Sequence, residues 1–389
     1  MINIKDKKNC CGCKACEIIC PKNCIEMTVD GEGFWYPIVD KDKCIDCGMC
    51  EKSCPILNKA SRKKSFDAKI YGAYSNNESI RINSSSGGMF SELAASVLEK
   101  NGAVFGCTMN DDFSFAKHIK VEDVDDLSKL QGSKYLQSDT NITFEEVKNC
   151  LQNGQKVLYS GTPCQIAGLK SYLKKSKTSD LELITVDFIC HGVASSKIWN
   201  SYKENLEKVF KSKLKKVEFR NKTYGWKNFS LHCSFENQKT YKEKITDDLY
   251  LRGFVADYYL RPSCYDCQFK GDNIKSDITL ADFWGIDKVN PKFNDDKGAS
   301  LVVIHSQKGQ QIFDEIKDNE KITCFSENAE KGLEYNPSYY NSVKMKSMRK
   351  VFFKQFEKNG VEAFENCCGK SNKTKFIRKI NTLKDKIGF

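Results

Sequence analysis

The sequence predicts a small cysteine-rich domain with both helices and strands, followed by a larger mixed α/β domain. Cysteines recur at regular spacings within residues 1–57, and a polar, basic stretch at 58–69 reads as a linker. From Ile70 onward, apolar strand-like segments alternate with segments of helical periodicity, which is typical of a parallel or mixed sheet. A chain of 389 residues is long enough for two or three domains with sizeable cores.

Composition narrows the class of protein. The sequence has no run of about 18 apolar residues, and its first residues, MINIKDKKNCC, do not read as a secretory signal. We therefore expect a cytoplasmic protein whose patterned cysteines bind metal or do chemistry instead of forming disulfides. The net charge of +11 suits an acidic partner, a phosphorylated cofactor or an anionic membrane. The basic stretch 213–229 matches no nucleic-acid motif and reads as a solvated strand, so we expect no nucleic-acid partner.

The small domain, residues 1–57, contains the same cysteine pattern twice. Each copy reads C-x2-C-x2-C-x3-C and is followed by proline, first from Cys10 and then from Cys44. In such a pattern three cysteines ligate one 4Fe-4S cluster, and the cysteine before proline ligates the other. The expected ligand sets are Cys10, Cys13, Cys16 and Cys54 for one cluster, and Cys44, Cys47, Cys50 and Cys20 for the other.

The segment between the two copies is expected to form a hairpin that turns at Asp30-Gly31. With its two motifs, this region resembles a bacterial two-cluster ferredoxin domain. Paired zinc knuckles are the alternative, but zinc does not require the doubled pattern. Cys11 and Cys24 fall outside the pattern, and we expect them to be packed thiols.

The larger domain, expected over 70–345 as one unit or two lobes, begins with four strand-like segments interspersed with three helical ones. Strands are expected at 70–75, 103–109, 156–160 and 181–190, and helices at about 88–100, 164–174 and 196–209. Four more strand-like segments follow at 216–221, 229–235, 276–283 and 299–305, with a helix after about 307. This order predicts a mixed sheet covered by helices.

Several turns in this domain carry chemically capable residues. Gly87 and Gly88 precede a helix whose N-terminus can bind an anion such as a pyrophosphate, although an ordinary serine-capped helix is the alternative. Cys164 lies in the first turn of a helix, where a lowered thiol pKa would favour a nucleophile or metal ligand; a buried structural cysteine is equally compatible. Cys190 and His191 are adjacent at a strand end, so their side chains should point apart and not form a dyad.

The remaining cysteines divide into two groups. Four occur at turns or strand ends and are enough for one more 4Fe-4S cluster or a zinc site: Cys164, Cys190, Cys264 and Cys267. Six others have no ligand spacing and are expected to be structural thiols: Cys107, Cys150, Cys233, Cys324, Cys367 and Cys368.

Five motifs together resemble the coenzyme F-420 hydrogenase/dehydrogenase beta-subunit family over residues 70–345: SSSGG, GSKYLQS, GTPCQIAGLKSYL, DFICHG and RPSCYDCQFK with SDITLADFWGI. The resemblance implies an iron–sulfur flavoprotein that binds FAD. It places flavin contacts at Ser85, Ser86, Gly87, Gly88, Ser133, Lys134, Gly161, Thr162 and Pro163. It also implies that Cys164, Cys190, Cys264 and Cys267 ligate a cluster. Lys134 would contact a phosphate or the flavin ring, or else be a surface lysine, and Asp282 and Trp284 would pack beside the site.

The function expected from these features is an oxidoreductase that passes electrons between ferredoxin-type clusters, FAD and an unidentified small-molecule substrate. Archaeal members of the family use the deazaflavin coenzyme F-420, and many bacterial members are associated with polysaccharide biosynthesis. No catalytic residue can be named. The alternative is a non-catalytic electron-transfer subunit, and either function implies a redox partner such as a ferredoxin or a larger oxidoreductase.

The C-terminal segment, 346–389, is expected to be helical and to end in a basic amphipathic helix. Its apolar residues fall along one face, with lysines elsewhere: Phe376, Ile377, Ile380, Leu383 and Ile387. Such a helix can lie peripherally on the inner face of an anionic membrane, dock an acidic partner or pack on its own domain.

Overall fold

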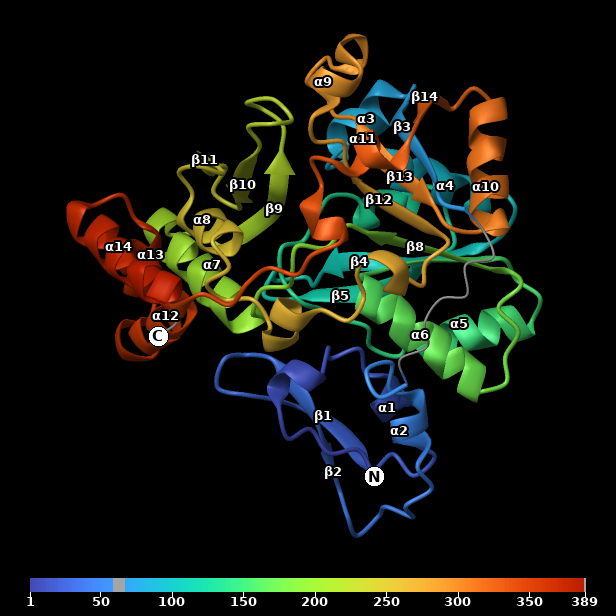
Figure 1. Ribbon diagram of the computed structural model, residues 1–389, viewed down its shortest axis with the longest axis horizontal. Coiled ribbons are helices and arrows are strands. Elements are labelled where there is room, and N and C mark those ends of the chain that lie inside the picture. Colours follow the sequence, from blue (N-terminus) through green and yellow to red (C-terminus); the bar gives the residue numbers. More distant parts are fainter. Residues whose placement is uncertain (59–66, 388–389) are drawn as a thin grey trace.

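The computed structural model describes residues 1–58 and 67–387 (Figure 1). It confirms the expected fold class, because a small N-terminal domain with a short hairpin precedes a larger domain built on a mixed sheet. The expected linker, 58–69, lies mostly at 59–66, outside the described residues. Among the residues that are described, no helix is both long and apolar enough to cross a membrane.

The N-terminal domain repeats its backbone conformation along with its cysteines. Helix α1 (Ala15–Ile18) follows Lys14, and helix α2 (Met49–Ser53) follows Gly48; both preceding residues have positive φ, 64° and 69°. Strands β1 (Ile25–Val29) and β2 (Trp35–Val39) form an antiparallel hairpin between the two helices. The Asp30 carboxylate closes the hairpin by accepting the N–H groups of Glu32 and Phe34.

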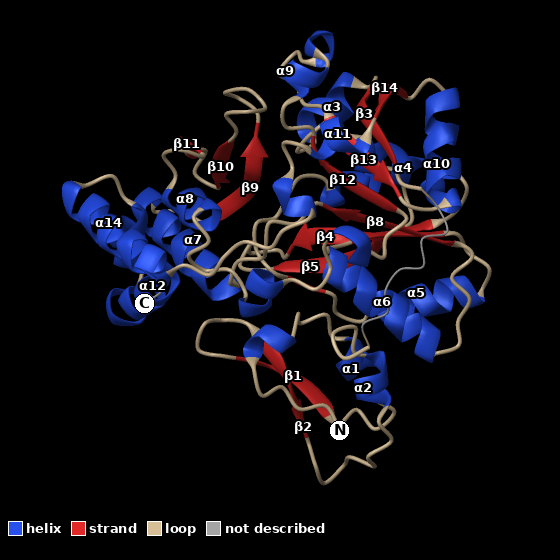
Figure 2. Cartoon of the chain, in the orientation of Figure 1, coloured by secondary structure: helices blue, strands red, loops and turns tan. Residues whose placement is uncertain are grey.

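The larger domain is organised around one nine-stranded sheet (Figure 2). In spatial order its strands are β14 (Ile322–Glu327), β3 (Lys69–Ser75), β13 (Ser300–Ile304), β12 (Ile278–Asp282), β8 (Leu183–Phe188), β7 (Val157–Ser160), β4 (Ala103–Met109), β5 (Ala116–Val121) and β6 (Ser138–Asp139). Strands β12, β8, β7 and β4 run parallel, and β3 runs in the same direction because both β3 and β12 are antiparallel to β13. The carboxyl ends of these five strands therefore share one edge, where open α/β sheets place their ligands.

Helices cover both faces of this sheet. On one face lie α4 (Met89–Leu98) and α10 (Gln307–Asp318), and on the other lie α5 (Thr143–Gln152) and α6 (Pro163–Lys175). Strand β7 shows why, since Leu158 packs in the core with α4 whereas Val157 and Tyr159 pack in the core with α6. Alternate residues of a strand point to opposite faces, so an apolar run buried on both sides needs helices on both sides.

A second lobe packs beside the sheet (Figure 1). It contains a three-stranded antiparallel sheet and a group of helices: β9 (Leu214–Asn221), β10 (Ser230–Phe235), β11 (Thr240–Lys244), α7 (Ser196–Phe210), α8 (Leu249–Val255), α12 (Ser347–Asn359), α13 (Glu362–Cys368) and α14 (Asn372–Ile387). The remaining α-helices are α3 (Glu78–Asn83), α9 (Ile286–Val289) and α11 (Ala329–Leu333). Short 3-10 helices lie at Lys7–Asn9, Asp125–Leu130, Pro262–Asp266, Gly271–Asn273, Pro291–Phe293 and Pro337–Tyr339.

Two differences from the expected elements matter for function. Strand β8 ends at Phe188, so Cys190 lies in the following loop and not in the strand. In the C-terminal helix, Ile377 is half-buried against the second lobe, whereas Phe376, Ile380 and Leu383 are exposed. The expected single apolar face is therefore divided, and the side chain of Ile387 lies outside the described residues.

Candidate functional site

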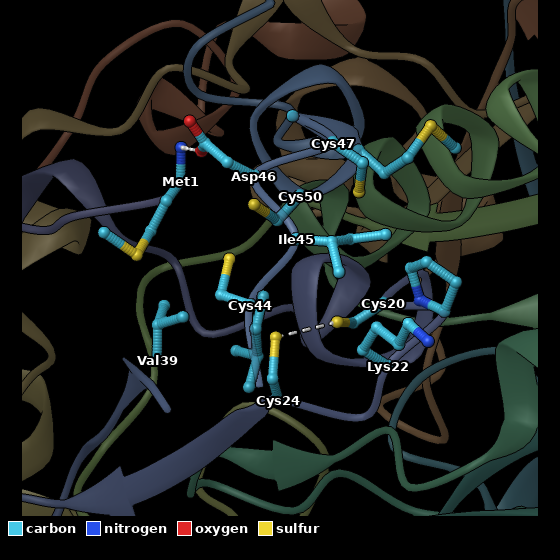
Figure 3. A pocket seen from close by; sticks show the side chains of 14 residues that line it. Met1, Cys20, Lys22, Cys24, Val39, Cys44, Ile45, Asp46, Cys47 and Cys50 are labelled. Carbon is cyan, nitrogen blue, oxygen red and sulfur yellow. Dashed lines mark hydrogen bonds and ion pairs between the residues drawn. The ribbon is translucent and has the colours of Figure 1, made fainter. Parts of the chain in front are cut away.

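Two cavities lie inside the N-terminal domain, and each is lined by cysteines from both sequence repeats. The first has an empty volume of about 340 Å³ and is lined by the first three cysteines of the second repeat, Cys44, Cys47 and Cys50, together with Cys20 of the first (Figure 3). Its sulfurs come from α2, from the loop that precedes α2 and from the turns after α1, and the backbone N–H of Ile2 donates to Cys50 Sγ at 3.3 Å. Four cysteines around one cavity match the donor set that a 4Fe-4S cluster needs.

The second cavity, about 320 Å³, has the complementary lining. Cys10, Cys13 and Cys16 of the first repeat meet Cys54 of the second repeat there. The structure therefore groups the cysteines as the crossed ligand pattern requires. Across the described residues, no three His, Cys, Asp or Glu side chains converge tightly enough for a single metal ion. Cysteines that bind different irons of a cubane surround a cavity and need not converge on one point.

The two cysteines outside the repeat pattern also reach these cavities. Cys24 lines the first, with its sulfur 3.3 Å from Cys20 Sγ, and Cys11 lines the second. Both are buried, in keeping with packed thiols, but they pack against the expected ligands. The Cys11 thiol also interacts with the thiols of Cys13 and Cys164, so it lies where the N-terminal domain meets the larger one.

A third group of thiols gathers at the carboxyl edge of the large sheet. The loop after β8 lies against the segment that carries the C-x2-C pair: a Cβ on Gly192 would lie 3.3 Å from Cys264 Cβ, and Arg261 N–H donates to Val193 O at 2.9 Å. Burial raises the pKa of the Cys190 thiol, and the other three thiols act in the same direction: Cys164, Cys264 and Cys267. The four turn and strand-end cysteines are thus neighbours in space.

The expected lowering of the Cys164 pKa is wrong. Cys164 does lie in the first turn of α6, but its interaction with the Cys11 thiol and its burial raise the pKa well above the usual value. In this environment the interaction with the Cys11 thiol and the desolvation together outweigh the partial positive charge of the helix N-terminus. His191, the neighbour of Cys190, lies with its Nε2 2.7 Å from Asp257 Oδ1 in the second lobe.

Helix α6 joins the second cavity to the third group of thiols. Cys164 occupies its first turn, and Gly168, one turn later, packs directly on Cys13. A Cβ at Gly168 would lie 2.8 Å from Cys13 Cβ and 2.9 Å from Cys13 Sγ. Four residues of an α-helix rise about 6 Å, so the two candidate ligand groups adjoin along one helical turn.

Arg261 fixes this junction from the other side. Its guanidinium is fully buried and donates to Cys10 O at 2.8 Å, Gln137 Oε1 at 2.9 Å and Trp35 O at 2.9 Å. Arg261 lies three residues before Cys264 in the chain. Its bond to Cys10 O therefore connects the segment that carries Cys264 to the loop that carries Cys10. The sequence gives no hint of this role, because the acceptors lie more than 120 residues away along the chain.

The expected flavin contacts lie at the same carboxyl edge, and some of them touch. Ser85 Oγ and Ser133 Oγ are 2.8 Å apart, and Ser133 N–H donates to Ser85 Oγ at 2.7 Å. Lys134 is not a freely solvated lysine, since its ammonium donates to Leu130 O and Gln131 O, and burial lowers its pKa. The loops before α4 and after the 3-10 helix 125–130 are thereby tied together.

The other expected flavin contacts are engaged with protein groups. A Cβ on Gly87 would meet Ala73 O at 2.5 Å, and Gly88 takes φ of +89° as the N-cap of α4. Ser86 Oγ donates to Ala299 O at 2.8 Å. Thr162 caps α6 in a reciprocal arrangement with Gln165, while Gly161 precedes this cap and Pro163 begins the helix. Packing and helix capping therefore account for the glycines and the proline at these positions. The same contacts hold the turn before α4 and the turn before α6 at the sheet edge.

Sequence reasoning missed two cations that complete this edge. Arg220 of β9 pairs with Asp282 through two bonds of 2.7 and 2.9 Å and donates to Ser85 O at 3.2 Å. Within the described residues its buried Nε has no hydrogen-bond partner. Lys222 donates to Ser86 O at 2.6 Å, and burial lowers its pKa to about 7. Both residues lie in the basic stretch 213–229, which the sequence led us to interpret as a solvated strand, so their positive charges were the available clue.

Asp282 and Trp284 lie beside these cations. Asp282 accepts the indole N–H of Trp226 at 2.7 Å as well as the Arg220 bonds, and Trp284 stacks on Trp226 with ring centroids 5.2 Å apart. The donor set fits an anionic cofactor, because two cations and an unpartnered buried N–H lie next to a helix N-terminus.

Cysteine-lined cavities in a repeated domain, beside a sheet edge with further thiols, define an iron–sulfur protein of the electron-transfer class. Comparison with known families agrees. A 4Fe-4S dicluster domain model matches residues 9–57. The models for the coenzyme F420 hydrogenase/dehydrogenase beta subunit match residues 70–142 with the N-terminal part and 154–330 with the C-terminal part. The chain belongs to this family of oxidoreductase subunits and carries a 4Fe-4S dicluster domain in front of it.

Comparison with curated protein sequences found no match. Among solved structures, a chain of the xenon-derivatized F420-reducing NiFe hydrogenase complex from Methanosarcina barkeri is similar, with 17% sequence identity and a TM-score of 0.48. The match covers 76% of this chain and 90% of that chain.

Proposed function

We propose that the protein is an iron–sulfur flavoprotein that passes electrons between 4Fe-4S clusters, a bound FAD and a small-molecule substrate. The observation that supports this most is the succession of three four-cysteine groups. The two cavities of the N-terminal domain and the thiols at the sheet edge follow one another, and α6 joins the last two. When bound, clusters carry electrons singly and a flavin exchanges them in pairs, so the two cofactor types together link one-electron and two-electron chemistry.

The proposed cluster-binding residues are those grouped by the cavities and by the sheet edge. Cys44, Cys47, Cys50 and Cys20 would hold the cluster farthest from the larger domain, and Cys47 is exposed, which suits access by an external redox protein. Cys10, Cys13, Cys16 and Cys54 would hold the next. Cys164, Cys190, Cys264 and Cys267 would hold a third, and all four are partly buried.

The FAD would bind at the carboxyl edge, near Ser85, Ser133 and the N-terminus of α4. We add Arg220 and Lys222 to the contacts proposed there, because both side chains lie beside Ser85 and Ser86 and a pyrophosphate there would favour the charged form of Lys222. Coenzyme F420 as substrate and a role in polysaccharide biosynthesis rest on the family resemblance.

Metal and flavin contents test the proposal. After anaerobic purification and cluster reconstitution, we expect about twelve irons, with equal acid-labile sulfide, and one FAD per chain. The variant Cys190→Ser with Cys264→Ser should lose about four irons, whereas Cys233→Ser with Cys367→Ser, two buried thiols of the second lobe, should lose none. If the native protein contains only about eight irons, and Cys190→Ser with Cys264→Ser leaves that number unchanged, the proposed third cluster does not exist.

The flavin contact has its own test. Ser85→Ala breaks both bonds between the two loops, and we expect FAD to dissociate about tenfold more readily, as expected from one or two lost hydrogen bonds. Ser128→Ala, an exposed serine on the 3-10 helix 125–130, is the matched control. A native protein without bound flavin would contradict the proposed site.

A non-catalytic electron-transfer subunit is the second candidate. The family description as a beta subunit favours it, and so does the exposed Cys47. Turnover of a small acceptor by the isolated chain would distinguish the enzyme from the subunit.

A further inference from the structure

Helix α14 presents an apolar stripe to solvent instead of to its own domain. The stripe consists of Phe376, Ile380 and Leu383, which are 64%, 38% and 50% exposed. At 3.6 residues per turn these three side chains fall within an arc of about 60°. Aromatic and aliphatic side chains grouped in this way lose favourable burial energy in water, so the stripe requires an apolar environment to cover it.

The opposite side of the helix binds the protein through polar groups. Thr374 and Asn381 are buried, and Thr374 Oγ1 donates to Glu365 O at 3.1 Å. Ser347 donates its hydroxyl to Asn381 O at 3.1 Å and its N–H to Asp385 Oδ1 at 2.8 Å. These bonds to α12 and α13 fix the rotation of the helix, so the outward direction of the stripe is built into the fold.

Lysines flank the stripe along both sides. By the same helical geometry, Lys373 and Lys384 lie about 50–70° from its centre on one side, and Lys379 and Lys386 lie about 70–90° from it on the other. All four are exposed. The helix lies at the outer edge of the second lobe (Figure 1). An apolar centre between two cationic margins is the arrangement of a helix that lies in a lipid headgroup region.

We propose that α14 docks the protein on an anionic lipid surface, with Phe376, Ile380 and Leu383 inserted among the acyl chains and the flanking lysines on the headgroups. Charge complementarity and the two-sided placement of the lysines favour a membrane over a protein partner. An acidic protein groove would cover the stripe but would not require cations on both margins. The proposal is independent of the cofactors, because α14 contributes no candidate ligand.

The test is co-sedimentation of the full-length, anaerobically purified protein with vesicles. One set contains phosphatidylcholine alone, and the other contains phosphatidylcholine and phosphatidylglycerol in equal parts. We expect sedimentation with the anionic vesicles only, and weaker sedimentation as salt is raised. No sedimentation with the anionic vesicles, or equal sedimentation with both sets, would overturn the proposal.

Two matched pairs of variants identify the surface. Phe376→Ser, Ile380→Ser and Leu383→Ser together should abolish sedimentation, whereas three exposed apolar residues elsewhere should be dispensable: Val29→Ser, Leu181→Ser and Val209→Ser. Neutralising Lys373, Lys379 and Lys384 with glutamine should weaken binding about a hundredfold, at about fivefold for each lysine. The control replaces the exposed lysines Lys174, Lys208 and Lys239 in the same way. Unchanged iron content shows that each variant has folded.

A direct readout of insertion completes the test. Phe376→Trp adds an indole to the stripe, and brominated phosphatidylglycerol should quench its emission beyond the quenching seen for the native tryptophans. Equal quenching of the two proteins would overturn insertion. If vesicles do not bind the protein but the serine variant loses a complex with a purified acidic protein, the surface belongs to that partner and the proposal is wrong.

Discussion

At the scale of single residues, burial gives Lys222 both a structural role, through its hydrogen bonds, and an altered pKa. Lys222 donates its ammonium to Arg81 O, Ser86 O and Lys297 O, so one cation joins three loops at the sheet edge. Burial and the nearby charge of Arg220 lower its pKa to about 7. The folded protein therefore releases a proton at a pH where the unfolded chain, with a lysine pKa of about 10.4, still holds it.

This difference predicts a pH dependence of stability. Between pH 7 and 10 the unfolded state binds more protons at this residue, so the free energy of unfolding should rise with pH, by up to about 1.4 kcal/mol per pH unit. Lys222→Met should remove this rise, whereas Lys239→Met, an exposed lysine, should keep it. Urea midpoints measured across this range check the prediction, and parallel pH profiles for the native protein and Lys222→Met would contradict it.

At the scale of elements, α6 does more than cover the sheet. Its first turn carries Cys164, and Gly168 allows the loop of Cys13 to approach the helix backbone. Glycine in a helix interior costs about 1 kcal/mol relative to alanine, and here the close contact with Cys13 accounts for it. The helix therefore sets the separation between two candidate cofactor sites.

Replacing Gly168 with alanine tests this role. Despite its better helix propensity, Gly168→Ala should destabilise the protein by about 1–3 kcal/mol, because the new methyl group overlaps Cys13. Loss of Cys13 geometry should also lower the iron content by up to about four per chain. Gly31→Ala is the control, because a Cβ there meets no atom within 4 Å. Iron assays and urea unfolding check both expectations, and a stabilised Gly168→Ala with full iron content would refute them.

At the scale of the whole molecule, the N-terminal domain is docked on the larger domain by bonds from separate elements. Arg349 of α12 pairs with Glu32 at 2.8 Å through one nitrogen, Lys14 pairs with Asp139 at 2.8 Å, and Arg261 joins three segments. Partly buried ion pairs and charged bonds to main-chain oxygens need well-defined geometry. We therefore expect a fixed relation between the two domains and not a domain that swings on its linker.

Removing the central arginine should loosen this docking. Arg261→Met leaves Cys10 O and Trp35 O without their donor, at about 1.5–3 kcal/mol for each bond from a charged group. Amide hydrogen exchange should then speed up by at least about tenfold in residues 10–13 and 33–37. Arg252→Met is the matched control, since Arg252 also donates to main-chain oxygens but within the second lobe. Exchange unchanged in Arg261→Met would mean that the other bonds suffice for docking.

The sequence alone determined whatever depends on local spacing. The doubled cysteine pattern predicted a two-cluster domain, which the dicluster match over 9–57 confirms, and alternating periodicities predicted the mixed sheet. Helical periodicity placed Phe376, Ile380 and Leu383 together, because residues three and four apart share a helix face. Such features need only neighbours along the chain.

Only the tertiary structure decided which distant residues meet and which face of a helix turns outward. Cys164 and Cys190 come together because the parallel strands β7 and β8 end at one edge, and Cys264 joins them from the 3-10 helix that follows α8. Cys11 reaches Cys164 because Gly168 lets the two domains touch. The stripe of α14 faces solvent because Thr374 and Asn381 bind the domain. Contacts between segments hundreds of residues apart depend on packing and burial of the whole chain, which no local pattern encodes.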